Sequence, residues 1–363
     1  MTDPSGTPPP VGSETLEATE IARLTRGVLV QDAGRPIRGA AVDSRRVQPG
    51  NLFVALPGER TDGHEHLAEA VANGAAAILV SRPGLPAALP GVSIVRVPRP
   101  VEALGAIAAG WRNRFEPLTV GITGSIAKTS TKEVAAAVLA GRFRTLRSEG
   151  NENNEIGLPL TVLRLDGSVE ALVLEMGMYV GGEIADLARI ARPQIGVVTA
   201  VQPVHLARIG SIEAIERAKA ELVEALPAGG SAVLNADDER VRRMAGRTAA
   251  RVLLYGFGAA ADVTAEAVVS AGSAGMRFVL RTPFGRQSIA LPSLGRHAVH
   301  NALAAAAVGT LAGLQLDEIA AGLAVPPPAA HRGDLIRLGD VTIVEESYNA
   351  APASMRGALA VLA

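Results

Sequence analysis

Short hydrophobic runs alternate with amphipathic stretches along most of the chain, and glycine- or proline-containing turns separate them. Hydrophobic runs of about four to eight residues are typical of buried strands, whereas apolar residues repeating every three or four positions are typical of helices. Before Pro117 this pattern predicts strands at residues 39–45, 51–56, 75–80 and 92–97, and helices at residues 14–30, 65–72 and 101–114.

After Pro117 the pattern becomes a repeated strand, turn and helix. The predicted strands lie at residues 118–123, 171–176, 195–201, 231–236 and 251–256. Strands that alternate with helices form βαβ units and a mainly parallel sheet. A strand-rich stretch (263–291), an alanine-rich helix (298–312), two more strands and a helix starting near Pro352 complete the pattern. We therefore predict an α/β fold built from several domains.

Changes in composition predict the domain limits. Residues 1–13 are rich in Pro, Gly, Ser and Thr and cannot contribute to a core, so we expect a disordered tail. We place a first α/β domain at residues 14–115 and a central domain at residues 116–330, which ends in a proline-rich segment. Residues 331–363 then begin a further domain.

Composition excludes several classes of function. The 363 residues carry a net charge of −1 and no cysteine, which argues against a general nucleic-acid binder and removes thiol chemistry and disulfides. The N-terminus lacks the basic start and apolar stretch of a signal peptide, and no hydrophobic run is long enough to span a membrane. We expect a cytoplasmic monomer without membrane insertion.

Lysine is rare in this chain. Only three of the 35 basic residues are lysines, at positions 128, 132 and 219, and the other 32 are arginines. Lysine presents a compact ammonium to phosphates, and it can lose its proton when buried and act as an amine, whereas arginine cannot. The three lysines are therefore candidates for chemistry, although each could also be an ordinary lysine on a solvated face.

The segment GITGSIAKTSTKE (121–133) has the features of a phosphate-binding loop. It follows a predicted buried strand and begins a helix, so backbone N–H groups at the helix N-terminus would face an anion. Lys128 would reach the terminal phosphates of a nucleotide, and the Thr129 hydroxyl would bind Mg²⁺. The strict phosphate-loop pattern fails at Ile122 and Ala127, so an ordinary strand-to-helix turn is the alternative.

This segment resembles the loop of the ATP-dependent Mur ligases, G-x-T-G-(T/S)-x-G-K-(T/S). Ala127 stands where the family has glycine; if the backbone there requires a positive φ, the extra Cβ costs about 1–2 kcal/mol. The NADD (235–238) and GRHAVHNALAAAA (295–307) segments are similar to the family's adenine-site motifs, with His297 as a neighbour. The ATP contacts that the resemblance implies are Gly121, Thr123, Gly124, Ser125, Ala127, Lys128, Thr129, Ser130, Asn235, Asn301 and Arg332.

The resemblance also implies a metal site. Glu175 ends a predicted strand, at the edge of the sheet where open α/β folds bind ligands. Glu175 and His205 match the family's metal-binding glutamate and histidine, together with Thr129. Lys219 matches a lysine that reacts with CO₂ to form a metal-binding carbamate, which requires a neutral amine. The implied catalytic residues are Lys128, His205 and Lys219, and Lys132 is interpreted as structural.

Two further segments indicate the substrate. SEGNENNEIGLPLTVLRL (148–165) is similar to the branch of the family that joins D-alanyl-D-alanine to a UDP-N-acetylmuramoyl-tripeptide, as is the segment EESYNAAPASMRGAL near the end of the chain. Segment 42–66 is similar to the family's uridine-binding region. The implied substrate contacts are Asp43, Ser44, Arg45, Asn151, Asn153 and Asn154.

The resemblance implies ATP-dependent ligation through an acyl phosphate, with ATP and Mg²⁺ as cofactors, in peptidoglycan synthesis. It implies a UDP-binding first domain, an ATP-binding central domain and a Rossmann-like third domain of which residues 331–363 are only the start. We expect these 363 residues alone to bind the UDP substrate but to ligate poorly. The alternatives are another amino-acid-adding branch, a catalytically silent nucleotide-binding homologue and an unrelated phosphate-loop kinase.

Overall fold

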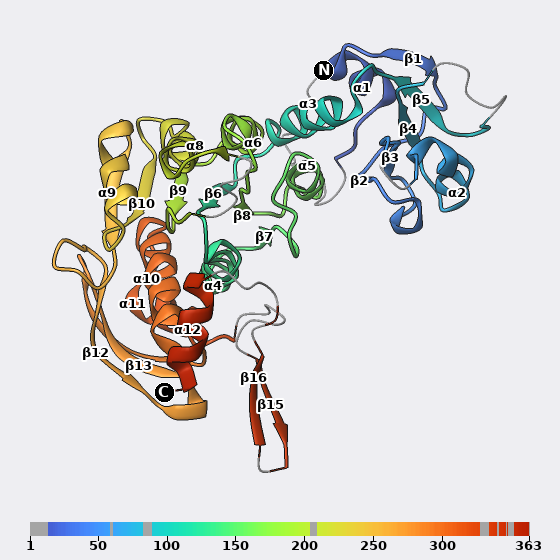
Figure 1. Cartoon of the computed structure of the whole chain (residues 1–363). Coiled ribbons are helices and arrows are strands. Elements are labelled where there is room, and N and C mark those ends of the chain that lie inside the picture. The colour runs from blue at the N-terminus through green and yellow to red at the C-terminus, as the bar shows by residue number, and fades with distance from the viewer. Residues whose placement is uncertain are drawn as a thin grey trace, which may run out of the picture. The chain divides into compact units, whose positions relative to one another are not determined.

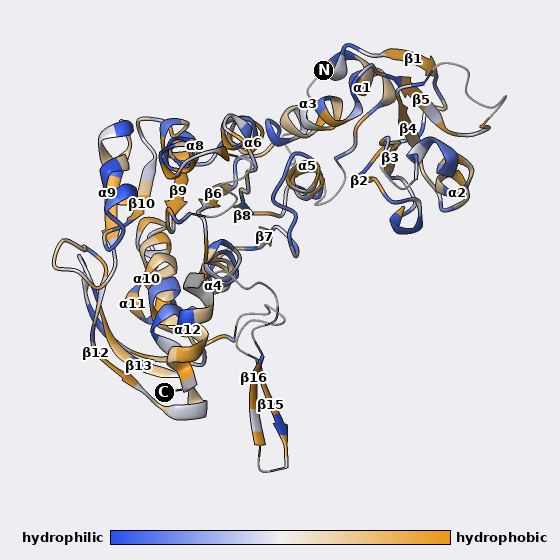
Figure 2. Ribbon diagram, viewed as in Figure 1, coloured by the Kyte–Doolittle hydropathy of each residue, from blue (hydrophilic) through white to orange (hydrophobic). Residues whose placement is uncertain are grey.

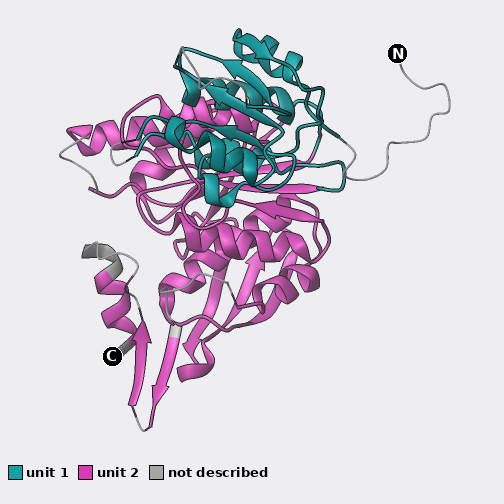
Figure 3. Cartoon of the chain, turned by 90° about the vertical axis from the view of Figure 1, so that its right-hand side faces the viewer, with its two compact units in different colours: residues 1–116, 155–169 teal, residues 117–154, 170–363 magenta. Residues whose placement is uncertain are grey.

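A computed structural model describes residues 14–58, 61–82, 89–203, 209–326, 334–339, 341–345, 347 and 352–362. These residues fall into two compact units, one within Met1–Glu116 and Glu155–Val169 and the other within Pro117–Asn154 and Glu170–Ala363 (Figure 3). Both units combine helices with mainly parallel sheets, so the predicted α/β fold is confirmed. The domain limits that we predicted from composition stay a prediction.

The first unit is built on a five-stranded sheet with the order β1-β5-β4-β3-β2. All neighbouring pairs are parallel except β1 with β5. The interior strands β3 and β4 are hydrophobic, and every one of their residues is buried, as expected for a parallel sheet covered on both faces (Figure 2). The strands are β1 (Val28–Gln31), β2 (Ala40–Ala41), β3 (Leu52–Val54), β4 (Ala77–Val80) and β5 (Ser93–Arg96).

The helices of the first unit include one that comes later in the chain. They are α1 (Ala18–Thr25), α2 (Leu67–Ala72), α3 (Pro100–Arg112) and α5 (Gly157–Val162), with 3₁₀ turns at Ser44–Arg46 and Gly63–His66. The buried indole of Trp111 in α3 donates a hydrogen bond to the carbonyl oxygen of Leu165 (3.0 Å). This contact ties the segment after α5 to the first unit.

The helix predicted at residues 14–30 is too long. The helix α1 ends at Arg26, which adopts a left-handed conformation (φ 53°), and the N–H of Gly27 caps the carbonyl of Ala22. A Cβ on Gly27 would lie 2.8 Å from the carbonyl oxygen of Arg96, so the chain passes close to β5 at this point. The following VLVQ segment then pairs with β5 as strand β1, because backbone pairing along a sheet edge outweighs its helical periodicity.

The second unit is built on a six-stranded parallel sheet with the order β11-β10-β9-β6-β8-β7. The five predicted strands of this sheet are all present, and the short edge strand β7 was not predicted. The strands are β6 (Leu118–Thr123), β7 (Thr145–Arg147), β8 (Ala171–Glu175), β9 (Ile195–Val198), β10 (Ser231–Asn235) and β11 (Arg251–Tyr255).

Helices cover both faces of this sheet (Figure 1). One face packs against α4 (Lys128–Ala140) and α10 (Gly295–Leu311), whose alanine-rich sequence allows close approach, with α11 (Leu316–Leu323) behind them. A Cβ on Gly322 of α11 would lie 2.4 Å from the Cα of Val138, so α11 and α4 are in backbone contact there. The other face packs against α6 (Glu183–Ala191) and α8 (Ile212–Glu224), and α9 (Glu239–Arg243) and a 3₁₀ turn (Met244–Arg247) follow β10.

The strand-rich stretch forms a separate antiparallel sheet, β12 (Thr264–Ser270), β13 (Met276–Thr282) and β14 (Gly285–Leu291), as predicted. Its inner side chains join the core beside α10. The described part of the C-terminal segment contains a hairpin, β15 (Asp334–Leu338) with β16 (Val341–Glu345), and the helix α12 (Pro352–Leu362). Among the described residues, no helix is both long and apolar enough to cross a membrane.

Candidate functional site

The strand order of the second unit reverses at β6, which lies between β8 and β9. In open α/β sheets, ligands bind in the crevice outside the carboxyl ends of the strands at such a switch point. Ile122 at the end of β6 is in register with Glu175 of β8, and Thr123 is in register with Val198 of β9. The predicted phosphate loop therefore begins between Glu175 and the segment that follows β9.

The segment that follows β9 forms hydrogen bonds with the phosphate loop. Gly124 has a φ of 155°, and a Cβ there would lie 1.8 Å from the hydroxyl oxygen of Thr199, so only glycine fits. The Thr199 hydroxyl, whose residue is 3% exposed, donates to the carbonyl oxygen of Ile126 (2.6 Å). The N–H of Ser125 donates to the carbonyl of Ala200 (2.8 Å), and its hydroxyl bonds both the carbonyl and the N–H of Gln202.

Ala127 is in the left-handed region, with φ 66° and ψ 0°, at the N-cap of α4. Because φ is positive here, the Cβ of Ala127 carries the backbone strain of about 1–2 kcal/mol that was expected for this case. The side chain of Ala127 makes no capping hydrogen bond to α4, and the loop leads directly into the N-terminus of this helix, as in helix N-termini that bind anions. Lys128 donates from Nζ to the carbonyl oxygen of Gly124 (2.8 Å), which places its ammonium over the loop.

The other predicted loop residues have different surroundings. Gly121 lies inside β6, where a Cβ would be 3.0 Å from Leu222 and from Met176. The hydroxyl of Thr123 is buried and donates to the carbonyl of Met176 (2.8 Å). Thr129 and Ser130 are half-buried in the first turn of α4. Gly121 and Thr123 thus have structural contacts of their own, and their contact with ATP stays a prediction.

Glu175 is 2% exposed and lies at the carboxyl end of β8. Its Oε1 accepts a hydrogen bond from Nδ2 of Asn153 (2.8 Å), and its backbone N–H donates to the Ser148 hydroxyl (3.2 Å). Its second oxygen, Oε2, is buried and has no hydrogen-bond partner among the described residues. A buried carboxylate oxygen without a partner is costly unless it meets a cation, so this atom fits a metal ligand.

Lys219 lies in α8, a helix that the Ser211 hydroxyl caps by accepting from the N–H of Ala214 (3.1 Å). The side chain is buried, with 2% of the residue exposed. Burial, and secondarily the nearby charge of Lys128, hold the pKa of the Lys219 amine well below its usual value. These surroundings favour the neutral amine that carbamate formation requires.

Asn235 lies at the end of β10 and links the nucleoside side of the site to the phosphate loop. Its Nδ2 donates to the carbonyl of Thr199 (2.7 Å), and its Oδ1 accepts from the N–H of Asp237 (2.9 Å) and from Nε2 of His300 (3.1 Å). Both oxygen lone pairs and one of two N–H groups are therefore engaged. The contact of Asn235 with ATP stays a prediction.

His300 and Asp237 form a polar pair beside Asn235. Nε2 of His300 lies 3.4 Å from Oδ2 of Asp237, and that carboxylate also accepts the N–H groups of Phe257 and Gly258. The His300 hydrogen bond, with the two backbone N–H groups, lowers the pKa of Asp237 to about 2. No motif identified His300 in advance, because its role depends on Asn235 and Asp237, which are distant in sequence.

Two more predicted residues of the nucleoside side lie on α10. Asn301 is 8% exposed, and its Oδ1 lies 3.5 Å from the Thr131 hydroxyl of α4. Burial lowers the pKa of His297. Asn301 is therefore placed between α10 and the phosphate-loop helix, and its contact with adenine stays a prediction.

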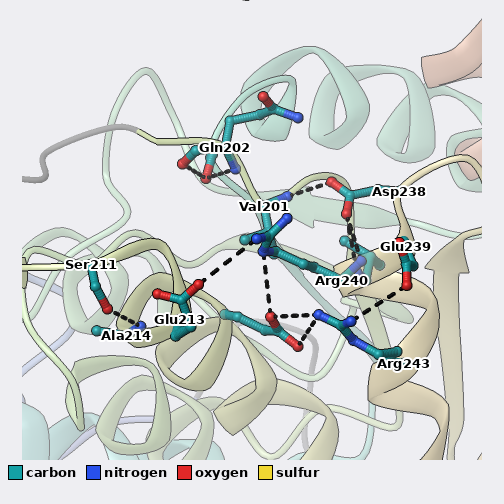
Figure 4. A network of polar contacts seen from close by, with 12 residues as sticks. Val201, Gln202, Ser211, Glu213, Ala214, Asp238, Glu239, Arg240 and Arg243 are labelled. Atoms are coloured by element: carbon teal, nitrogen blue, oxygen red, sulfur yellow. Dashed lines mark hydrogen bonds and ion pairs between the residues drawn. The ribbon is translucent and has the colours of Figure 1, made fainter.

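A charged network fixes α8 against α9 (Figure 4). Asp238 caps α9 through Oδ1 and accepts the N–H of Val201 through Oδ2 (2.8 Å). Arg240 lies between Glu213 (3.8 Å) and Glu216 (3.6 Å), and Arg243 also contacts Glu216 (3.2 Å). The helix that carries Lys219 is thereby held beside the segment that leaves β9.

The predicted uridine-site residues lie in the first unit and have mutual contacts. Arg45 pairs with Asp43 through two hydrogen bonds (2.9 and 2.7 Å), and this contact lowers the pKa of Asp43 to about 2. The Ser44 hydroxyl donates to Glu69 (2.6 Å). Asp43 also caps the 3₁₀ turn Ser44–Arg46, so the turn is ordered without a ligand.

His205 and Arg332 lie outside the described residues. Within the part of the chain that the structure describes, no group of three or more His, Asp or Glu side chains lies close enough together to hold a metal ion. The structure therefore brings together the phosphate loop, Glu175, Asn153 and Lys219, and Asn151 and Asn154 lie in the same loop as Asn153. Sequence reasoning missed Thr199 and His300, and it did not anticipate the burial of Lys132.

Comparisons with known families agree with this geometry. The Mur ligase middle domain matches residues 122–309, and the Mur ligase family catalytic domain matches residues 36–112. The first match runs from the end of β6 through the rest of the parallel sheet into α10, and the second spans most of the first sheet.

Individual relatives are similar over almost the whole chain. The UDP-N-acetylmuramoyl-tripeptide--D-alanyl-D-alanine ligase of Mycobacterium tuberculosis (strain ATCC 25618 / H37Rv) is 42% identical, over 96% of this chain and 73% of that protein. The ligase of the same name from Escherichia coli (strain K12) is 39% identical, over 96% of this chain and 76% of that protein.

Solved structures show the same similarity. MurF from Acinetobacter baumannii has a TM-score of 0.88 and 30% identity, and the match covers 96% of this chain and 76% of that chain. The MurF ligase from Thermotoga maritima in complex with ADP has a TM-score of 0.79 and 29% identity, over 90% of this chain and 74% of that chain. By sequence, by fold and by the arrangement of its phosphate loop and strand ends, this chain belongs to the Mur ligase family.

Proposed function

We propose that this chain acts as an ATP-dependent ligase that joins D-alanyl-D-alanine to UDP-N-acetylmuramoyl-tripeptide in peptidoglycan synthesis. The observation that carries the proposal is the meeting of three features at one sheet edge. These are a phosphate loop with Lys128, a buried carboxylate oxygen of Glu175 without a partner, and the buried amine of Lys219. Relatives that carry this activity in their names, at 39–42% identity, support it.

The reaction begins at the phosphate loop. The terminal carboxylate of the tripeptide attacks the γ-phosphorus of ATP, the bond to the bridging oxygen breaks, and ADP leaves. The N–H groups at the start of α4 and the ammonium of Lys128 stabilise the charge on the phosphates. The neutral amine of D-alanyl-D-alanine then attacks the acyl phosphate, phosphate leaves with the electrons of its C–O bond, and the amine loses a proton.

Mg²⁺ would neutralise phosphate charge at this site. Glu175 would hold one ion through Oε2, with Thr129 and His205 as further metal-binding residues, and a carbamate on Lys219 would hold a second ion. The carbamate forms when the neutral amine of Lys219 attacks CO₂, which makes an N–C bond and releases one proton. The lowered pKa of Lys219 supports this step, because burial disfavours the charged ammonium and so favours the neutral amine.

The substrate and ATP contacts belong to the same proposal. Asn151, Asn153 and Asn154 would meet the muramoyl-peptide, and Asp43, Ser44 and Arg45 would meet the UDP portion. Asn235, Asn301 and Arg332 would meet the nucleoside of ATP. We further propose that the protein works in the cytoplasm as a monomer, where its nucleotide substrates are available.

The experiment is a ligation assay on the protein as it is made in the cell, and the 363-residue chain is assayed beside it. We expect ADP release that requires both UDP-N-acetylmuramoyl-tripeptide and D-alanyl-D-alanine, and we expect Lys219→Ala and Lys219→Arg to lose at least about tenfold in rate. ADP release that requires a UDP-muramoyl-dipeptide and a single amino acid would instead identify another branch of the family. ATP binding without any acceptor-dependent release would indicate a silent homologue.

The unrelated phosphate-loop kinase is excluded by the family match over the central domain. A silent homologue has one observation in its favour, the strained Ala127. The loop nevertheless adopts the left-handed conformation with alanine in place, and Thr199 and Ser125 hold its backbone on either side. The active ligase therefore remains the better supported function.

A further inference from the structure

Lys132 is the one lysine that the proposed chemistry does not use. It lies one helical turn after Lys128 in α4, and its side chain is completely buried, with 0% exposed. An ammonium is among the most costly groups to bury without partners. The surroundings of this side chain therefore need an explanation.

Three acceptors surround the Lys132 ammonium. Its Nζ lies 2.7 Å from the carbonyl oxygen of Ser148, 3.4 Å from that of Gly150 and 2.8 Å from Oε1 of Glu133. The ammonium has three N–H donors and no acceptor, so each donor has one partner. The other oxygen of Glu133 accepts from Nε of Arg147 (2.6 Å), whose side chain is half-buried, so the buried Lys132–Glu133 pair continues to a third charge nearer the surface.

This arrangement suits lysine and not arginine. A guanidinium has five N–H donors in a planar fork, so arginine at position 132 would bring two more donors than the site has acceptors. The two carbonyls and the carboxylate converge on a single nitrogen. In a chain that otherwise uses arginine almost everywhere, the geometry accounts for a lysine here.

The carbonyls that Lys132 binds begin the loop that wraps the end of β8. Ser148 donates its N–H to Val173 (3.0 Å), and its hydroxyl accepts the N–H of Glu175 (3.2 Å). Farther along the same loop, the carbonyl of Asn153 accepts from Gly177 (2.7 Å), and its Nδ2 donates to Oε1 of Glu175 (2.8 Å). The loop thus forms hydrogen bonds with both the backbone N–H and the side-chain Oε1 of Glu175. Among the described residues, the Oε2 atom of Glu175 has no partner.

We propose that Lys132 is a positioning residue that fixes the 148–153 loop against Glu175 and so directs the free Oε2 oxygen toward the metal. The same contacts present the asparagines of the loop to the muramoyl-peptide. The inference rests on the proposed function for the identity of these ligands, but the aiming of Glu175 rests on the hydrogen bonds alone.

The test measures how much Mg²⁺ is needed for nucleotide binding, by calorimetry with a non-hydrolysable ATP analogue across a Mg²⁺ series. Lys132→Met should raise the half-saturating Mg²⁺ concentration about tenfold or more, the usual scale for a residue that orients a metal ligand. Lys132→Arg keeps the charge but not the geometry, so this substitution should also raise the half-saturating Mg²⁺ concentration. Val138→Ala, a core truncation on the same helix, should lower stability without changing the Mg²⁺ requirement.

A double substitution separates positioning from general stability. In a Glu175→Gln background, Lys132→Met should cause no further change in the Mg²⁺ requirement, because its effect passes through Glu175. An equal further increase in that background would overturn the proposal. An unchanged Mg²⁺ requirement in Lys132→Arg would also overturn the proposal. The Lys132→Arg variant therefore still tests the proposal if Lys132→Met does not fold.

Binding of UDP-N-acetylmuramoyl-tripeptide is measured on the same proteins. If the unsubstituted protein fails to bind this substrate, the proposed function is wrong, yet the Mg²⁺ series still tests Lys132. If the unsubstituted protein binds it and Lys132→Met binds it equally with an unchanged Mg²⁺ requirement, the positioning role is wrong and the proposed function stands.

Discussion

Replacing Ala127 by glycine should stabilise the second unit, which is the reverse of the usual effect of glycine in or next to a helix. Ala127 has φ 66°, and the left-handed conformation costs an L-residue about 1–2 kcal/mol that glycine avoids. Glycine also lowers the free energy of unfolding by roughly 0.4–1 kcal/mol, because it increases the entropy of the unfolded chain. The net expectation for Ala127→Gly is an increase of about 0–1.5 kcal/mol in the free energy of unfolding.

Urea unfolding measures this change, and Ala137→Gly is the matched control. Ala137 lies inside α4 with ordinary helical geometry, so glycine there should cost about 1 kcal/mol. The two substitutions, ten residues apart, should therefore shift the midpoint in opposite directions. If Ala127→Gly destabilises as much as Ala137→Gly does, position 127 is not strained and the reasoning is refuted.

ATP affinity shows where the strain is released. Contacts within the protein support the left-handed conformation of Ala127, because the Thr199 hydroxyl donates to the preceding carbonyl of Ile126 (2.6 Å). Ala127→Gly should therefore leave the Kd for ATP within about twofold, since folding and not binding bears the strain. Thr199→Val removes that anchor, and it should weaken ATP binding more in the presence of Ala127 than in the presence of glycine. Equal effects in both backgrounds would show that Thr199 does not hold the strained peptide.

Three further predictions follow from individual contacts. The buried amine of Lys219 is neutral above its lowered pKa, whereas the unfolded chain keeps it protonated to about pH 10.4, so the unfolded state binds more protons in between. In CO₂-free urea titrations the stability of the unsubstituted protein should therefore rise with pH relative to Lys219→Met, by at most about 1.4 kcal/mol per pH unit; a flat difference would contradict the burial of a neutral amine. Gly124→Ala should abolish ATP binding measured by calorimetry, because its Cβ would overlap the Thr199 hydroxyl, and retained binding would disprove the close approach. Glu175→Gln should weaken Mg²⁺-dependent ATP binding at least about tenfold without lowering the thermal midpoint, because it removes a buried charge whose Oε2 has no partner; a lowered midpoint would show that the carboxylate stabilises the fold.

The parallel sheet of the second unit and the strand-to-helix turn at residues 121–133 were predictable, because hydrophobic strands between turns leave a strong local pattern. The helix predicted at residues 14–30 was wrong at its end, since pairing of Val28–Gln31 with β5 is a contact between distant segments. The short strand β7 has only three residues, too few for a periodic signal. The helix α5 joins the first unit through contacts with α3, which no local pattern reveals.

The candidate site was predictable where a motif carries it and hidden where burial or backbone conformation decides. The sequence marked Ala127 as a departure, but only the fold shows that its φ is positive. Lys132 was interpreted as structural, yet its complete burial depends on a loop that comes 16 residues later. Thr199 belongs to no motif, and His300 lies within the 295–307 segment but was not singled out there, because the roles of these residues come from the carbonyl of Ile126 and the amide of Asn235.

Transfer of oxygen from substrate to phosphate tests the central claim most directly. UDP-N-acetylmuramoyl-tripeptide labelled with ¹⁸O in its terminal carboxylate is incubated with ATP, Mg²⁺, D-alanyl-D-alanine and the protein as it is made in the cell. An acyl phosphate intermediate carries one carboxylate oxygen into the inorganic phosphate that is released, so mass spectrometry should find one ¹⁸O in each phosphate. Ligated product accompanied by unlabelled phosphate, or phosphate released without any ligated product, would contradict the account.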